Sequence, residues 1–167
     1  MLRYAIAVIA AAACTPAYAQ WDVEVDGPDV FGETTVTVAA EFSAKDFFFI
    51  RCATDGEFTV GWMYLNEGEV RNVVVDMIVQ NDTGGPKARG EFEAALRNWN
   101  DKVAIFEVTD KSDARQILDI ISGAMNKIQF GVFAKELDVK ISDSISALGS
   151  TSAVKLVKKH CPVFTES

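Results

Sequence analysis

Apolar residues recur at every second position over much of the first two thirds of the chain, a spacing that predicts β-strands. Residues 35–42 and 58–64 alternate in this way, so each is expected to form a strand with one buried face. Residues 46–52 are apolar on both faces and therefore predict a central, buried strand. A polar turn is expected at 66–69, and branched residues resume over 70–79. The segments 46–52, 58–64 and 70–79 thus predict a meander of antiparallel strands.

The middle of the chain is less regular. Residues 81–90 contain three glycines and a proline and predict a loop. Residues 92–99 fit a strand or a helix, and residues 103–108 predict a strand. Further strands are expected over 127–134 and 136–145, the second with alternating apolar and polar residues and therefore one wet face.

Two helices are expected late in the chain. Ser112 is the expected N-cap of the first, Asp113 suits the positive end of the helix dipole, and apolar residues follow at near-helical spacing as far as Met125. For the second helix, Gly149 breaks the chain, Ser150 or Thr151 provides the cap, and an apolar stripe runs to the region of Cys161. That stripe consists of Ala153, Val154, Leu156 and Val157.

These elements predict an α+β fold, with an antiparallel β-sheet or sandwich of about seven to eight strands and two late helices packed on it. No repeat, low-complexity tract or linker divides the chain. We therefore expect a signal peptide over residues 1–19 followed by a single β-rich domain over 20–167. A chain of this size can bury roughly 68 to 70 per cent of its unfolded surface, which is enough for an independent core.

The first nineteen residues have the layout of a cleaved secretory signal peptide. Arg3 precedes an apolar run that ends at Cys14, and Ala17-Tyr18-Ala19 offers small residues at the two positions that a signal peptidase reads. Cleavage between Ala19 and Gln20 would place the protein in the periplasm or outside the cell. The apolar run is too short to cross a bilayer, which requires roughly 20 residues. The alternative is a chain that is lipid-anchored at Cys14.

Export would bring the remaining cysteines, Cys52 and Cys161, into an oxidising compartment, where such a pair usually forms a disulfide bond. We expect a structural disulfide, since the Cys-x-x-Cys spacing typical of redox pairs is absent from the sequence. The formal charge is -8, and loss of Arg3 with the signal peptide would make it -9. Such acidity opposes binding to nucleic acid or to anionic lipid, both of which require Lys and Arg.

Few residues suggest catalysis. His160 is the only histidine, and its position among lysines near a helix end is ordinary. Asp82-Thr83-Gly84 matches the tripeptide of aspartic proteases, but those enzymes need two facing aspartates, and the sequence contains one copy. The run from Gly149 to Ser152 suits either a helix cap or an anion cradle, without the lysine of a phosphate-binding loop. We therefore expect no enzyme activity, no metal and no cofactor.

Aromatic residues offer a different kind of site. Trp62, Tyr64 and Trp99 either line a groove for a saccharide or peptide or belong to the core. Asp82 and Arg89, in the predicted loop, complete the candidate binding surface. An enzyme site assembled from scattered residues such as Asp76, Asp82 and Arg89 is a further alternative.

The order of parts carries a family resemblance. The expected signal peptide is followed by an early Trp21, an apolar strand that ends in Arg51-Cys52, the segment from Ile145 to Val154 and a closing Cys161. This order resembles small exported bacterial proteins of the invasion-associated locus B family and is similar to accessory envelope proteins associated with type VI secretion. The resemblance implies a non-enzymatic accessory protein, periplasmic or secreted, that contacts another envelope or secreted protein. The alternative function is a binding module for a small apolar or saccharide ligand.

Overall fold

The computed structural model describes residues 21–43, 45–65, 72–85 and 87–164. The expected signal peptide over 1–19, the alternative anchor at Cys14 and the turn predicted at 66–69 lie outside these ranges. Within them, no helix is long and apolar enough to cross a membrane.

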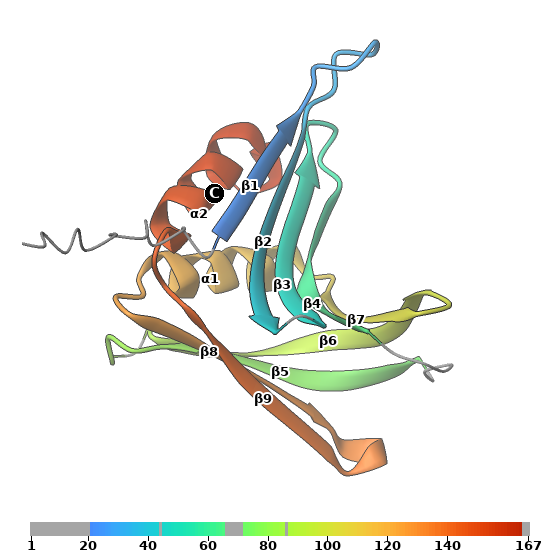
Figure 1. Ribbon diagram of the computed structural model, residues 1–167, viewed down its shortest axis with the longest axis vertical. Coiled ribbons are helices and arrows are strands. Elements are labelled where there is room, and N and C mark those ends of the chain that lie inside the picture. The colour runs from blue at the N-terminus through green and yellow to red at the C-terminus, as the bar shows by residue number, and fades with distance from the viewer. Residues whose placement is uncertain (1–20, 44, 66–71, 86, 165–167) are drawn as a thin grey trace, which may run out of the picture.

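The described chain forms one sheet and two helices (Figure 1). The strands are β1 (Trp21–Asp26), β2 (Thr35–Ser43), β3 (Asp46–Ala53), β4 (Phe58–Leu65), β5 (Val73–Asn81), β6 (Arg89–Asn100), β7 (Val103–Val108), β8 (Lys127–Ala134) and β9 (Val139–Ser146). The helices are α1 (Lys111–Ser122) and α2 (Ser150–His160), with short 3-10 turns η1 (Lys135–Leu137) and η2 (Pro162–Phe164). The strand order in the sheet is β1-β2-β3-β4-β7-β6-β5-β8-β9, and the neighbours are antiparallel.

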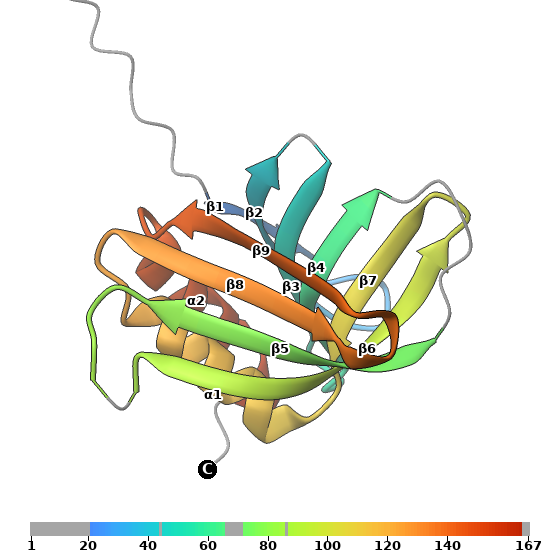
Figure 2. The ribbon, with the colours of Figure 1, turned by 90° about the horizontal axis from the view of Figure 1, so that it is seen from below.

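The sheet is curved into a half-barrel, and both helices pack on its inner side (Figures 1 and 2). Strands that are not neighbours in the sheet therefore meet across the interior. The ring of Phe130 on β8 lies 4.7 Å from that of Phe48 on β3 and 5.2 Å from that of Phe42 on β2. The prediction of a mostly antiparallel α+β fold with two late helices is confirmed, as one curved sheet and not a sandwich.

The strand count is nine, not seven to eight, and the strand missing from the prediction is β1. Residues 21–26 do alternate in polarity, but the segment is short and acidic and was not recognised as a strand. Pairing with β2 stabilises its extended conformation. Trp21 is buried at its start, and the Trp21 Nε1 donates a hydrogen bond of 2.8 Å to the Ser146 carbonyl at the end of β9. The two edges of the sheet are thus joined at one end.

The predicted meander is wrong at its third strand. β3 and β4 do pair, but β4 then pairs with β7, and β5 lies between β6 and β8. The hairpin of β6 and β7 therefore separates two strands that follow each other in sequence. Alternating hydrophobicity indicates which face of a strand is buried, but it does not identify the neighbouring strand. Residues 92–99, which fitted either element, belong to β6.

Both helix caps also differ from the prediction. The N-cap of α1 is Asp110, whose carboxylate accepts hydrogen bonds from the backbone N–H groups of Ser112 and Asp113. Asp110 is preferred because its side chain stands one position before the first helical residue, where a carboxylate satisfies free N–H groups. The helix ends at Ser122, so Met125 lies beyond it and is exposed.

Helix α2 is preceded by Gly149 in the left-handed conformation (φ 95°), and no side chain caps it. The hydroxyls predicted as caps bind α1 instead. Ser150 Oγ donates to the Ile121 carbonyl (3.1 Å), and Thr151 Oγ1 donates to the Ser122 carbonyl (3.0 Å). Carbonyl groups in the last turn of a helix have no intrahelical partner, so these hydroxyls both satisfy α1 and hold α2 against it.

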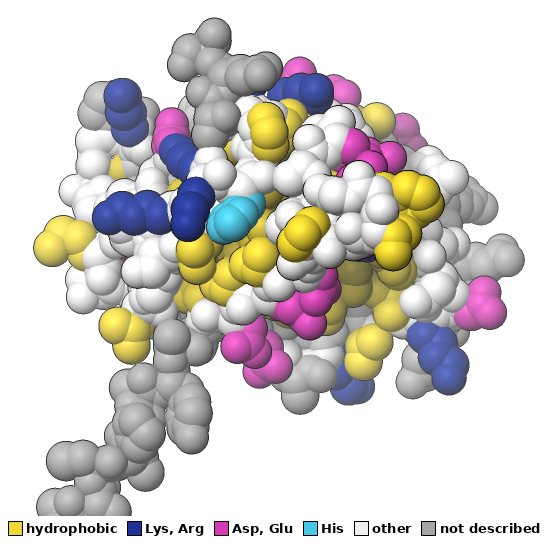
Figure 3. Space-filling model, turned by 90° about the horizontal axis from the view of Figure 1, so that it is seen from above, with side chains coloured by type: hydrophobic (Ala, Val, Ile, Leu, Met, Phe, Trp, Pro, Cys, Tyr) yellow, Lys and Arg dark blue, Asp and Glu magenta, His cyan; other side chains and the backbone are white. Residues whose placement is uncertain are grey.

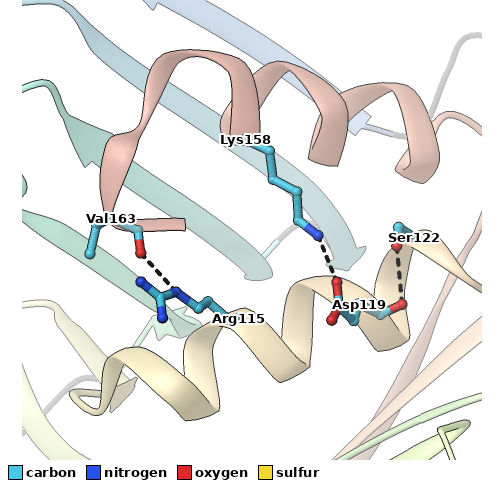
Figure 4. A network of polar contacts seen from close by, with 5 residues as sticks. All are labelled: Arg115, Asp119, Ser122, Lys158 and Val163. Carbon is cyan, nitrogen blue, oxygen red and sulfur yellow. Dashed lines mark hydrogen bonds and ion pairs between the residues drawn. The ribbon is translucent and has the colours of Figure 1, made fainter. Parts of the chain in front are cut away.

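Further polar contacts join the C-terminal segment to α1 (Figure 4). Lys158 forms an ion pair with Asp119, and the Arg115 Nε donates to the Val163 carbonyl at 2.9 Å. The predicted disulfide is also present, joining Cys52 on β3 to Cys161 across 109 positions with a Cα–Cα distance of 6.0 Å. The C-terminal end of α2 is thereby fixed to β3, the third strand of the sheet.

Candidate functional site

The structure does not bring the five candidate surface residues together. Trp62 and Tyr64 lie on the inner face of β4. Trp62 is 2 % exposed, and the Tyr64 ring stacks on Phe106 with a centroid distance of 5.3 Å. Burial, with a smaller contribution from Asp46, raises the pKa of Tyr64 above its usual value. Both aromatic side chains thus form part of the core, which was the second interpretation of their alternation.

Asp82 holds two loops together. Its carboxylate accepts hydrogen bonds from the backbone N–H groups of Met125 and Asn126, each at 2.9 Å, and from the Asn126 side-chain amide at 2.8 Å. These bonds, with that from Met125 the strongest contribution, lower the pKa of Asp82 to about 2. Arg89 forms an ion pair with Glu91 at the exposed start of β6. Neither Asp82 nor Arg89 lines the groove that contains Trp99.

Trp99 is the candidate residue that lines a groove. It lies at the end of β6 on the outer face of the sheet and is 41 % exposed. Its ring is 6.1 Å from that of Phe49 on β3, and the Arg97 guanidinium lies 5.7 Å from its centroid. Gly61 pairs with Phe49 on one side and with Glu107 on the other, so β4 places no side chain on the outer face at that level.

The groove beside Trp99 has a volume of about 740 Å³ and opens to solvent. This is within the range of small-molecule sites, roughly 300 to 1,000 Å³. Its lining combines basic, acidic, hydroxyl and aromatic side chains: Arg51, Arg97, Lys111, Glu33, Asp55, Glu57, Thr35, Thr59, Phe58 and Trp99.

Arg51 is an exposed cation that lines this groove. It stands on β3 between Thr37 of β2 and Thr59 of β4, and no described carboxylate lies within ion-pair distance of it. Arg97, in contrast, is held by the buried carboxylate of Glu107, with its Nε at 2.6 Å. Arg51 could have been noticed in the sequence, because it is the one charged residue within the apolar run 47–53. The run was used only to predict a strand.

A second exposed feature is the loop between β1 and β2, residues 27–34, which extends beyond the helices (Figure 1). Val30 and Phe31 at its tip are 92 % and 85 % exposed. The Asp29 carboxylate accepts hydrogen bonds from the N–H groups of Phe31 (2.8 Å) and Glu33 (2.9 Å), which fix the turn. A Cβ at Gly27 would lie 2.5 Å from the Glu33 carbonyl oxygen, so only glycine fits there.

The loop is also attached to its neighbour. Thr34 and Thr54 exchange hydrogen bonds, the Thr34 N–H to the Thr54 hydroxyl and the Thr54 N–H to the Thr34 carbonyl, both at 3.1 Å. Figure 3 views the molecule from this end, and it shows apolar side chains at the surface beside the single histidine and beside side chains of Lys or Arg. This exposed apolar loop could not be recognised from the sequence, because two apolar residues in a turn have no periodicity.

No group of three or more His, Cys, Asp and Glu side chains within the described ranges is arranged to hold a metal ion. The hydroxyls of Ser150 and Thr151, considered above as part of an anion cradle, donate to the carbonyls of α1.

Comparison with protein-family models, with curated proteins and with solved structures gives no match. The resemblance to exported envelope proteins therefore stays a prediction from the sequence.

Proposed function

We propose that this chain is an exported accessory protein of the bacterial envelope, periplasmic or secreted, which acts by binding another protein and not by catalysis. The observation that carries the proposal is the pair Val30 and Phe31 at the tip of the β1–β2 loop. Large apolar side chains on a soluble surface are common singly, but here two neighbours are exposed together at the end of a projecting loop.

The loop is suited to binding because its conformation is already fixed. Hydrogen bonds to Asp29 and to Thr54 hold it, so a partner would not have to order it on association. Full burial of a Val or Phe side chain contributes roughly 1.5 to 3 kcal/mol each. Two such side chains inserted in one pocket would form a compact hot spot.

The charge around the loop indicates the kind of partner. Residues 21–34 include five acidic residues and no lysine or arginine. An anionic membrane surface would repel such a hairpin, whereas a protein pocket with an apolar floor and a rim of Lys and Arg would complement it. We therefore infer that the partner is a protein with a basic surface around an apolar pocket.

Site-specific photo-cross-linking in the native host tests this proposal. A photoreactive residue at position 31 of the full chain should give one dominant protein adduct, and the Val30→Ser change should reduce its yield. The matched control places the same photoreactive residue at Val74, which is apolar and exposed on β5 at a distance from the loop. Equal adducts from the two positions, or none from position 31, would contradict the proposal.

A second candidate function is a binding module for a small apolar or saccharide ligand. It is supported by the exposed ring of Trp99 beside the outer groove. A ligand that stacks on this ring should shift tryptophan emission and raise the melting temperature. If glycans and apolar ligands produce neither change, this candidate is excluded.

A further inference from the structure

The outer groove has a charge arrangement that an uncharged sugar would not use, and its charged residues other than Glu33 lie outside the β1–β2 loop. One of its unpaired cations, Arg51, lies on β3 between a threonine of β2 and a threonine of β4. Its acidic residues, Glu33, Asp55 and Glu57, come from the two loops that the Thr34–Thr54 hydrogen bonds join. Opposite charges therefore lie at separate places along one groove.

The strand register gives the spacing of these charges. Arg51 pairs with Thr59, and Glu57, one residue before the start of β4, precedes Thr59 by two residues. Two residues of a strand span roughly 7 Å. Asp55 lies in the turn that joins β3 to β4, and Glu33 lies in the loop before β2, so both belong to loops beyond the ends of these strands.

These distances match a short peptide. A chain of two to three extended residues spans roughly 7 to 10 Å, so a carboxylate at Arg51 would place an amino terminus beside the acidic residues. Free terminal carboxylates are a recurrent recognition element, and an arginine fork binds them through two parallel hydrogen bonds.

The other side of Arg51 is apolar. Phe49 lies two residues before Arg51 on the same face of β3, and its ring contacts Trp99. The side chain of the last residue of a bound peptide would lie against this pair. Arg97 would not compete for the carboxylate, because Glu107 already neutralises it. Lys111 also lines the groove, and it adds a second cation that forms no ion pair within the described ranges.

We propose that this groove binds a short peptide with free termini, its carboxylate on Arg51, its last side chain against Trp99 and its ammonium group among Glu33, Asp55 and Glu57. This inference goes beyond the proposed protein contact and does not depend on it.

The test is an NMR titration of the full, oxidised chain with the dipeptide alanyl-phenylalanine, monitored at the indole N–H signals. The chain has three tryptophans, and two of them are internal controls, because Trp21 donates to Ser146 and Trp62 is buried. The Trp99 signal, assigned by its loss in Trp99→Phe, should shift with saturation at millimolar peptide, while the other two stay in place.

Two modified dipeptides separate the charges. Alanyl-phenylalanine amide lacks the carboxylate and N-acetyl-alanyl-phenylalanine lacks the ammonium group, and each should bind at least about tenfold more weakly. Arg51→Gln should weaken binding of the free dipeptide to a similar extent, whereas Arg89→Gln, a change to an arginine outside the groove, should not.

Unchanged Trp21 and Trp62 signals in Arg51→Gln would show that the variant is folded. A Trp99 signal that does not respond to the free dipeptide would overturn the proposal, as would equal binding of either modified dipeptide. The protein contact at Val30 and Phe31 would be unaffected by that result.

Discussion

At the scale of single residues, the chemistry of a side chain here depends on which face of the sheet it occupies. Trp62 and Trp99 are indistinguishable by residue type, yet the first is in the core and the second lines a groove. The alternation of 58–64 correctly indicates that Trp62 and Tyr64 share a face. It does not reveal that Phe106 and Phe42 cover that face, because those contacts come from other strands.

The role of Asp82 likewise depends on residues that are distant in sequence. Its tripeptide matched that of a catalytic carboxylate within a predicted loop. The structure places Asp82 in a turn, as expected, and its carboxylate also accepts hydrogen bonds from the segment between α1 and β8. Residues more than forty positions apart make this contact, so local sequence gave no sign of it.

This role predicts a particular dependence of stability on pH. The pKa of Asp82 is lowered to about 2 in the folded protein, from about 3.8 when unfolded. Its contribution to the free energy of unfolding is therefore fully present above the unfolded value and is lost as pH falls through the folded value. Asp82→Asn should lower the melting temperature at pH 6, and the difference from the unchanged protein should become much smaller as pH falls to 2 and vanish below it.

The control for that experiment is Asp101→Asn, in the exposed β6–β7 turn, where no side-chain hydrogen bond to the carboxylate is described. A melting-temperature difference for Asp82→Asn that is the same at pH 6 and pH 2 would exclude the ionised carboxylate as the cause.

At the scale of elements, the sequence predicted which segments form strands and helices far better than how they join. The strands β2, β3, β4, β7 and β8 were expected near their observed bounds because periodicity is a local property. The insertion of β7 and β6 between β4 and β5 depends on contacts between strands that are distant in sequence. It was therefore not predictable from the periodicity. The prediction of Ser150 or Thr151 as the cap of α2 was wrong for a related reason. Both side chains can cap a helix, but their hydroxyls donate to carbonyl groups of α1.

The junction of the two helices can be tested with one pair of variants. Ser150 is fully buried, and Ser150→Ala would leave the Ile121 carbonyl without the hydroxyl, which should reduce the free energy of unfolding by about 1 kcal/mol. Ser152→Ala, in the same turn of α2 but exposed, should leave it unchanged or slightly increased, because alanine favours the helix. Urea unfolding measures both, and equal effects would argue against the interhelical bond.

At the scale of the whole molecule, long-range links hold the curved sheet and its helices as one body. The disulfide joins β3 to the end of α2, and Trp21 joins the first strand to the last. The pairing of Cys52 with Cys161 was predictable because export would leave two cysteines. The curvature of the sheet was not, since it follows from how nine strands and two helices pack together.

Removal of the disulfide should have a large effect. In the loop-entropy model, closing a loop of this length contributes roughly 4 to 5 kcal/mol, so Cys52→Ala with Cys161→Ala should lower the free energy of unfolding by a substantial part of that amount. Denaturant unfolding with and without a reductant provides the measurement. If the reductant changes neither the double variant nor the unchanged protein, the disulfide does not stabilise the fold.

The proposed function is itself a claim about the whole molecule, because it treats the folded domain as a support for one exposed loop. The most direct test is the affinity of the purified full chain for the protein cross-linked at position 31, measured at two salt concentrations. Val30→Ser with Phe31→Ser should weaken binding by at least about thirtyfold, Met125→Ser at another exposed apolar position should not, and added salt should weaken binding of the unchanged chain. Equal affinity for all three proteins would contradict the proposal that Val30 and Phe31 form the contact.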